Sequence, residues 1–208
     1  LIATYQAIVD DWELVIKHLR KHQQKHSDEY YYKIRSSVPL NGAARAARLI
    51  YLNRTCWNGL YRVNKKGQFN VPKGSRDTVL FEHDDFARIS GLLRKADLIC
   101  QDFEVTIESA KPNDLIFADP PYTVKHGNNG FLKYNETLFS WDDQIRLKNV
   151  LLNAARTGVH VVLTNANHES IRNLYSSCFQ VKTVDRKSLL AANASDRKSC
   201  KELVIISR

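Results

Sequence analysis

The first part of the chain carries apolar side chains at helical intervals. Over residues 1–20 they recur three or four positions apart, the spacing of one helix face, which predicts a helix there. A segment rich in Ala, Arg and Leu predicts a second helix over 43–52, and a third is expected over 84–94. Between them, 60–63 and 68–71 flank Asn64-Lys65-Lys66-Gly67, which predicts a β-hairpin with glycine in its turn.

Short apolar runs in the rest of the chain predict strands, and they lie at 98–101, 115–118, 159–163, 179–184 and 203–206. The run 115–118 stands between two aspartates and is expected to be a buried strand of a parallel sheet. Ser140, with Asp143 at the capping-box position, predicts a helix that ends at Gly158. The polar stretch 123–139 is expected to be a mobile loop over a site, and the basic stretch 185–201 a second loop. Alternating helices and strands predict the α/β class.

Asp119-Pro120-Pro121-Tyr122 follows the run 115–118 directly. Proline has no N–H for the sheet ladder and a nearly fixed φ, so the strand should end there in a rigid corner. Open α/β sheets bind their ligands just beyond the carboxyl ends of strands. An acid and an aromatic ring at that place predict a binding or catalytic site, and the structural alternative is a proline turn capped by Asp119.

This tetrapeptide resembles the catalytic motif of amino-methyltransferases, which use S-adenosylmethionine to methylate the exocyclic amine of a base. Such an amine is a poor nucleophile, but the sulfonium cofactor carries an activated methyl group, so no covalent enzyme nucleophile is required. The Asp119 carboxylate and the Pro120 carbonyl are candidate acceptors for the amine hydrogens. Tyr122 is a candidate for stacking on the base.

A second signature consists of Asn58-Gly59-Leu60-Tyr61-Arg62-Val63-Asn64 and Gly67-Gln68-Phe69-Asn70-Val71-Pro72. Together with the first motif it resembles the Dam-type adenine-N(6) DNA methyltransferases of the alpha group, which methylate within short palindromes such as GATC. The resemblance covers nearly all 208 residues. It implies a Rossmann-like sheet for the catalytic domain, at 1–27 and 74–208, and a small helical and β-hairpin DNA-recognition insertion at 28–73.

The resemblance also implies a role for each matching residue, with S-adenosylmethionine as cofactor and double-stranded DNA as partner. A flipped adenine would be held by Asp119, Pro120, Pro121 and Tyr122, and the cofactor by Asp102, Phe103 and Asp119. Arg62 would read a guanine edge. Leu60 and Pro72 would contact bases, and Trp57 and Asn58 would lie near the space left by the flipped base. Phosphate contacts would come from Lys65, Lys66, Lys73, Arg186, Lys187, Arg197 and Lys198.

Other interpretations of these residues stay open at this point. Trp57 is equally compatible with a role as a core aromatic. The lysines and Arg62 are also compatible with a solvated surface that binds nothing. The family's Gly-rich cofactor loop and the acid after its second strand do not appear in the sequence. We therefore expect the residues for the methionine and ribose parts of the cofactor to lie outside this chain, which alone would bind the cofactor weakly. The alternatives are a DNA-binding protein without catalysis, or an amino-methyltransferase for cytosine N(4) or RNA.

Composition and charge fit a protein that binds nucleic acid without identifying one. The net charge is +9 and the isoelectric point about 9.4, which favours a polyanionic partner. No apolar run approaches a membrane span. Four scattered cysteines without a CxxC motif favour reduced thiols, a cytoplasmic protein and no metal site. A companion restriction endonuclease is a candidate partner, and the oligomeric state stays open.

Two further groups of polar residues are expected to have structural rather than catalytic roles. His18, His22 and His26 recur at helical spacing, but no carboxylate completes a metal site, so we expect a solvated basic helix. Asn165 and His168 follow a predicted strand close to the inferred site. For them packing or helix capping is preferred to a role beside the catalytic residues.

Overall fold

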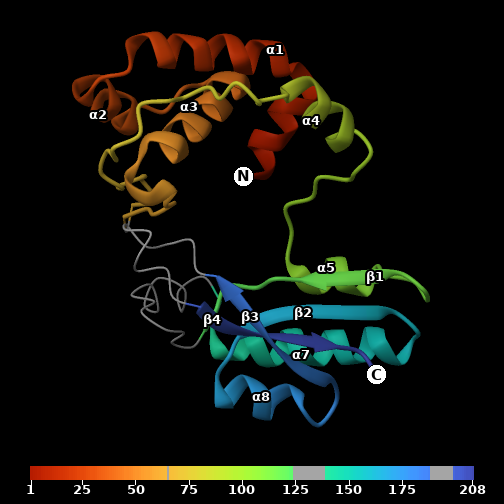
Figure 1. Cartoon of the computed structure of the whole chain (residues 1–208). Helices are drawn as coiled ribbons and strands as arrows, with labels where there is room; N and C mark the ends of the chain where they lie inside the picture. The colour runs from red at the N-terminus through yellow and green to blue at the C-terminus, as the bar shows by residue number, and fades with distance from the viewer. Residues whose placement is uncertain (65, 124–138, 188–198) are drawn as a thin grey trace. The chain divides into compact units, whose positions relative to one another are not determined.

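The computed structural model describes residues 1–64, 66–123, 139–187 and 199–208, and it describes only the backbone at 186–187 and 199–200 (Figure 1). The chain divides into two compact units, Leu1–Cys100 and Gln101–Arg208. Helices and a mixed sheet are both present, which confirms the α/β class. The boundary between the two units follows Cys100. The functional division into 1–27, 28–73 and 74–208 stays a prediction.

The first unit is mainly helical. Its elements are α1 (Ile2–Lys25), α2 (Asp28–Ser36), α3 (Gly42–Thr55), the 3-10 turn η1 (Trp57–Gly59) and α4 (Phe86–Leu93). The three predicted helices are confirmed, although α1 is broken at Asp11, where φ is −156° and ψ is 78°. The Asp11 carboxylate accepts a hydrogen bond of 2.8 Å from the Leu14 N–H and so caps the second half of α1.

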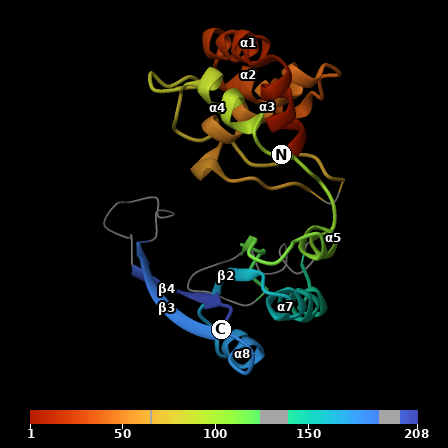
Figure 2. The same ribbon diagram turned by 90° about the vertical axis from the view of Figure 1, so that its right-hand side faces the viewer.

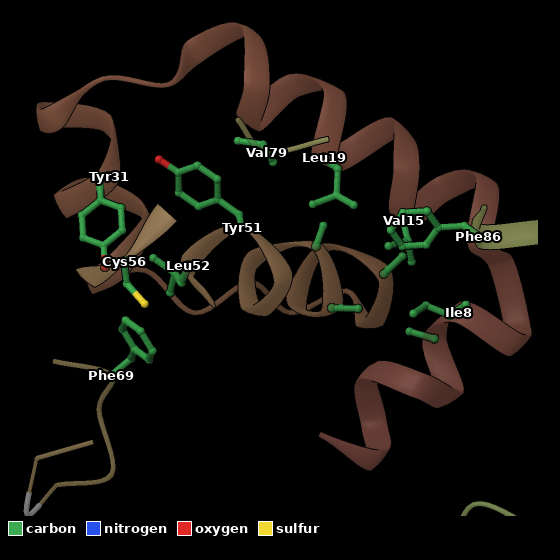
Figure 3. Close-up of a cluster of buried hydrophobic side chains, with 14 of the residues drawn as sticks. Ile8, Val15, Leu19, Tyr31, Tyr51, Leu52, Cys56, Phe69, Val79 and Phe86 are labelled. Atoms are coloured by element: carbon green, nitrogen blue, oxygen red, sulfur yellow. The ribbon is translucent and has the colours of Figure 1, made fainter. Parts of the chain in front are cut away.

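The core of this unit lies where α1 packs along α3 and α4 (Figure 3). Val15 and Leu19 of α1 are fully buried, as are Tyr51 and Leu52 of α3. Tyr31 of α2 is buried against them, and its hydroxyl donates to the backbone carbonyl of Val71 at 3.0 Å. Burial of apolar surface therefore holds the helices together, and this hydrogen bond links α2 to the second arm of the hairpin.

The histidines of α1 are partly packed rather than solvated. The side chain of His26 is only 5% exposed, and its ring nitrogens bond to the Tyr51 hydroxyl at 2.9 Å and to Asp77 at 3.0 Å. His22 stacks on Tyr51 with the ring centroids 4.7 Å apart, and burial lowers the pKa of His22 to about 4. The prediction of a solvated helix face is wrong for these two residues, because the tyrosine of α3 and the loop carrying Asp77 cover them.

The predicted hairpin is confirmed as two chain segments joined around a turn. The Asn70 N–H donates to the Arg62 carbonyl at 3.0 Å, and the Asn64 N–H donates to the Gln68 carbonyl at 2.9 Å. Gly67 lies in the turn with φ of +73°, a conformation that glycine adopts without strain. Phe69 is buried, so one side chain of the hairpin anchors it to the helical core.

Gly74, at the base of the hairpin, has no room for a side chain. Its N–H donates to the Thr55 carbonyl at 2.8 Å, and an added Cβ would lie 2.6 Å from the Cys56 carbonyl oxygen. We expect Gly74→Ala to destabilise the unit by about 1–3 kcal/mol, because backbone atoms must move apart. Urea unfolding measures the loss. Gly42→Ala is the matched control, since a Cβ at Gly42 meets nothing within 4 Å. Equal stability of the two variants would contradict this packing.

The second unit is built on a four-stranded sheet. Its strands are β1 (Leu115–Ala118), β2 (His160–Ala166), β3 (Gln180–Lys187) and β4 (Ser199–Ile206), in the order β1-β2-β4-β3. β1 and β2 are parallel, and the other two pairs are antiparallel. The helices are α5 (Phe103–Glu108), α7 (Trp141–Arg156) and α8 (Glu169–Tyr175), and Figures 1 and 2 show α7 and α8 against the sheet.

One face of the sheet forms the core with α7 and α8. Leu151 of α7, Tyr175 of α8 and Leu163 of β2 are all fully buried. The predicted start of α7 is confirmed: the Ser140 hydroxyl accepts from the Asp143 N–H, and the Asp143 carboxylate accepts from the Ser140 N–H. In the described part of the chain, no helix has both the length and the apolar character needed to cross a membrane.

Three predictions for the strands need correction. Residues 98–101 form no strand, because Asp102 begins α5 immediately afterwards. β1 is not buried: Leu115 and Phe117 are each 65% exposed, since β1 pairs only with β2 among the described residues and one of its faces carries no described layer. The basic stretch 185–201 is partly strand, because β3 and β4 stay paired out to Lys187 and Ser199.

Candidate active site

The predicted corner lies at the end of β1, on the sheet face opposite α7. Side chains alternate along a strand, so Asp119 continues the side occupied by Leu115 and Phe117. An open cavity of about 610 Å³ lies there. It is lined by Phe117, Asp119, Pro120, Pro121, Tyr122, Thr164 and Glu202. The structure thus brings the four predicted catalytic residues together around one cavity, which is large enough for a small ligand.

Thr164 of β2 holds the Asp119 carboxylate. Its hydroxyl donates to Asp119 Oδ1 at 2.5 Å. The parallel register explains the contact, because Ala118 of β1 pairs with Leu163 of β2, and the next residue of each strand points to the same side of the sheet. Sequence reasoning did not single out Thr164. The signal available was the alternation in β2, which places Thr164 on the face opposite the buried Leu163.

Glu202 supplies a second acid from β4. It pairs in register with Ala166 of β2 and lines the same cavity as Asp119. Two carboxylates with the rings of Phe117 and Tyr122 give the cavity acidic and aromatic walls. Such walls suit a cationic or flat aromatic ligand. The sequence analysis did not predict Glu202 as a site residue.

Asp102 and Phe103 form a separate cluster at the start of α5. The Asp102 carboxylate caps α5 and binds Arg146 of α7 through two bonds of 2.6 and 2.9 Å. The Arg146 guanidinium lies 4.1 Å from the centre of the Phe103 ring. Hydrogen bonds from Arg146 and from the Glu104 N–H lower the pKa of Asp102. Neither Asp102 nor Phe103 lines the cavity around Asp119, and their cofactor role stays a prediction.

The residues predicted to contact bases, or to lie near the space left by the flipped base, are largely accessible in the first unit. Trp57 is 50% exposed, so the alternative of a core aromatic is wrong. Asn58 is exposed with φ of +53°, and Leu60 is half-buried. Pro72 is exposed, and its carbonyl accepts from the Trp57 N–H at 2.9 Å, which places the two residues side by side. This surface is available to a ligand.

Arg62 is exposed on the hairpin and is oriented by Asn70. Its Nε–H donates to Asn70 Oδ1 at 2.8 Å, and Nη2 donates to the Asn70 carbonyl at 3.3 Å. Lys66 is exposed in the turn. Lys65, Arg197 and Lys198 lie outside the described residues, and Arg186 and Lys187 are described only as backbone of β3.

Lys73 has protein partners in the first unit. Its side chain is only 15% exposed, and Nζ lies 3.0 Å from Asp77 and 3.3 Å from Asp28. The hydrogen bond to Asp77, followed by contacts with Asp28, raises the pKa of Lys73. A phosphate contact by Lys73 stays a prediction, and it would have to replace or share these ion pairs.

Asn165 and His168 have the structural roles that were preferred for them. Asn165 is fully buried, donates to Gln144 Oε1 at 3.1 Å and accepts from the Ala166 N–H at 2.8 Å. His168 caps α8, since its ring nitrogen accepts from the Ser170 N–H at 3.2 Å. Within the described ranges, no group of three or more histidines, cysteines or acids is placed to hold a metal ion.

Comparison with known proteins identifies the family of the chain. The family model described as "D12 class N6 adenine-specific DNA methyltransferase" matches residues 1–189. The chain belongs to this family. It is therefore an adenine-specific DNA methyltransferase, and DNA is its substrate.

This methyltransferase is similar to proteins of several organisms. It is 32% identical to Type II methyltransferase M.MjaIII of Methanocaldococcus jannaschii, over 95% of this chain and 73% of the relative. It is also 32% identical to Type II methyltransferase M1.LlaDCHI of Lactococcus lactis subsp. cremoris, over 99% and 75%. A DNA adenine methylase of Vibrio cholerae is 30% identical, over 86% and 65%.

Proposed function

We propose that the enzyme transfers the methyl group of S-adenosylmethionine to the exocyclic amine of an adenine flipped out of duplex DNA, in the cavity around Asp119. The observation that carries this proposal is the position of the Asp119 carboxylate, which Thr164 holds beside an open cavity. Two prolines and Tyr122 follow Asp119 and line the same cavity. An amine acceptor, a rigid backbone and a stacking ring are the groups that methylation of an amino group needs from a protein.

The residues of the corner act on the amine rather than on the methyl group. Asp119 Oδ2 and the Pro120 carbonyl accept the two amine hydrogens, so the nitrogen lone pair turns from the ring toward the methyl group. As the N–C bond formed, the S–C bond would break and its electron pair would stay on sulfur as a neutral thioether. The positively charged amine would then lose a proton to water, so a strong base is unnecessary. An adenine within the duplex cannot bring this amine to a protein cavity, so the base must be extruded and stacked on Tyr122.

The acidic and aromatic walls of the cavity fit the proposed methyl donor. S-adenosylmethionine, when bound, supplies an activated methyl group on a positively charged sulfur. The carboxylates of Asp119 and Glu202 and the rings of Phe117 and Tyr122 are suited to a neighbouring cation. The sheet with β1 and β2 parallel supports a Rossmann-like catalytic domain, with the corner at the carboxyl end of β1.

We assign DNA recognition to the insertion 28–73. Its hairpin exposes Arg62 and Lys66, and the chain carries a net charge of +9. A guanidinium fork reads a guanine edge in the major groove, whereas a lysine contacts phosphate without distinguishing sequences. The two residues are therefore expected to have different effects when they are replaced.

Arg62→Ala is expected to reduce discrimination at one base pair by about 1–3 kcal/mol, because a bidentate base contact is lost. The measurement is the methylation rate on duplexes that differ from the mapped target by single base pairs. Lys66→Ala is the matched control on the same hairpin. It should weaken binding to all duplexes and lower the salt dependence of the affinity by about one unit of slope. An unchanged sequence preference in Arg62→Ala would remove Arg62 from the reading role.

Base flipping has its own test. After the methylated position has been mapped by sequencing, 2-aminopurine is placed there in a synthetic duplex. We expect its fluorescence to rise when the enzyme binds, since an extruded base loses its stacking neighbours in the duplex. The same probe one base pair away should respond little. Methylation without a response at the target position would contradict the flipped-base proposal.

The names of two relatives support a further proposal about biological role. M.MjaIII and M1.LlaDCHI are named Type II methyltransferases, which supports a part in restriction–modification beside a companion endonuclease. The Vibrio cholerae relative is named DNA adenine methylase. Testing whether host DNA is cleaved when this gene is deleted separates the two roles: lethal cleavage supports a companion nuclease, and unharmed growth contradicts it.

A further inference from the structure

The contact between Thr164 and Asp119 is built from two neighbouring strands. Asp119 is the first residue after β1, and Thr164 lies within β2, one step beyond the register pair of Ala118 and Leu163. The hydroxyl-to-carboxylate distance is 2.5 Å, which is that of a short, charge-assisted hydrogen bond. The donor therefore belongs to the sheet itself rather than to a loop.

Thr164 is suited to hold a carboxylate in one orientation. A β-branched side chain has few rotamers on a strand, so the hydroxyl has little freedom to move. The bond is made to Asp119 Oδ1 and does not involve Oδ2. One oxygen of the carboxylate is thus bound by the sheet, and Asp119 lines the cavity.

We propose that Thr164 is a positioning residue for methylation: it fixes the Asp119 carboxylate so that Oδ2 accepts an amine hydrogen of the base. This inference rests on the proposed function of the same cavity. Thr164 also lines the cavity, and its proposed effect on the reaction is exerted through Asp119. Without the Thr164 hydroxyl, the Asp119 carboxylate rotates more freely about its side-chain bonds. Oδ2 is then oriented to accept the amine hydrogen for a smaller fraction of the time.

The test compares Thr164→Val, which keeps the shape but lacks the hydroxyl, with Thr164→Ser, which keeps the hydroxyl. We expect Thr164→Val to lower kcat about 10- to 100-fold, the effect of one hydrogen bond to a charged group, with unchanged affinity for DNA. Thr164→Ser should restore most of the rate. Equal activity of Thr164→Val and the unchanged enzyme would overturn the proposal, as would a loss of rate that Thr164→Ser does not restore.

A double-mutant cycle with Asp119→Asn separates positioning from a structural role. If Thr164 acts through the carboxylate, Thr164→Val should cost little further rate in the Asp119→Asn background, where the carboxylate is already gone. A structural defect would cost the same factor in both backgrounds and would contradict the inference. If the unchanged enzyme forms no methylated adenine, the proposed function fails instead, so the two failures are distinguishable.

Discussion

Asp119→Ala is expected to lower methylation by at least about 100-fold and to leave DNA affinity nearly unchanged, since it removes an acceptor aimed at charge that develops in the transition state. Asp119 lies at the cavity, in the second unit, whereas Arg62 and Lys66 lie on the hairpin of the first. The rate is measured in a single turnover with labelled S-adenosylmethionine, and DNA affinity by fluorescence anisotropy.

The matched control for this variant is Asp114→Asn. Asp114 precedes β1, at the opposite end of the same short strand, and its carboxylate accepts from the Lys111 N–H at 2.8 Å. Asparagine keeps a carbonyl oxygen for that bond, so the strand should be retained and the rate preserved. Equal losses of rate in Asp114→Asn and Asp119→Ala would mean that the effect is structural and not catalytic.

Gln144→Leu is expected to destabilise the second unit by about 2–5 kcal/mol, because it leaves two buried polar groups without a partner. Gln144 of α7 is fully buried, donates to the Tyr175 hydroxyl at 2.6 Å and accepts from Asn165 at 3.1 Å. These bonds join α7, α8 and β2 directly behind Thr164. Urea unfolding, with hydrogen exchange of the β2 amides to localise the effect, measures the loss.

A control on the same helix and a double variant sharpen this test. Asn153→Ala, at an exposed position of α7, should change the free energy of unfolding by less than about 0.5 kcal/mol. Adding Tyr175→Phe to Gln144→Leu removes one of the unpaired groups. The double variant should therefore lose less stability than the sum of the two single changes. Strict additivity would contradict a connected network.

The sequence predicted the position of the corner at Asp119 because its signals are local. Two prolines soon after four apolar residues end a strand wherever the strand lies. Asp119, between the apolar run and the prolines, is therefore placed at the end of the strand. The capping box of Ser140 and Asp143 is equally local, since both partners lie within one helical turn. These features depend little on the rest of the fold, and the structure confirms their positions.

Features that depend on partners distant in the sequence were missed or wrong. Thr164 meets Asp119 only because β1 and β2 are parallel and in a particular register, which a lone threonine in an apolar run does not indicate. Residues 98–101 have a strand's composition, but they pair with no strand in the described part of the chain. Asp102 caps a helix and is the partner of Arg146.

Short helices were missed where their sequence signal was brief. α2 starts at Ser27, whose hydroxyl accepts from the Tyr30 N–H at 3.1 Å, and Asp28 and Glu29 occupy its first turn. This serine followed by acids is a recognisable start signal, but no long apolar period follows it. The helix is stabilised instead by tertiary packing, chiefly by the burial of Tyr31.

The central claim is that the corner at Asp119 directs methylation to the amine of adenine. The most direct measurement is mass spectrometry of nucleosides from the DNA of a methylation-free host that expresses this gene, beside the same host with the Asp119→Ala gene. We expect N6-methyldeoxyadenosine with the first gene and none with the second. N4-methyldeoxycytidine in its place, or N6-methyldeoxyadenosine at equal levels with both genes, would contradict the account.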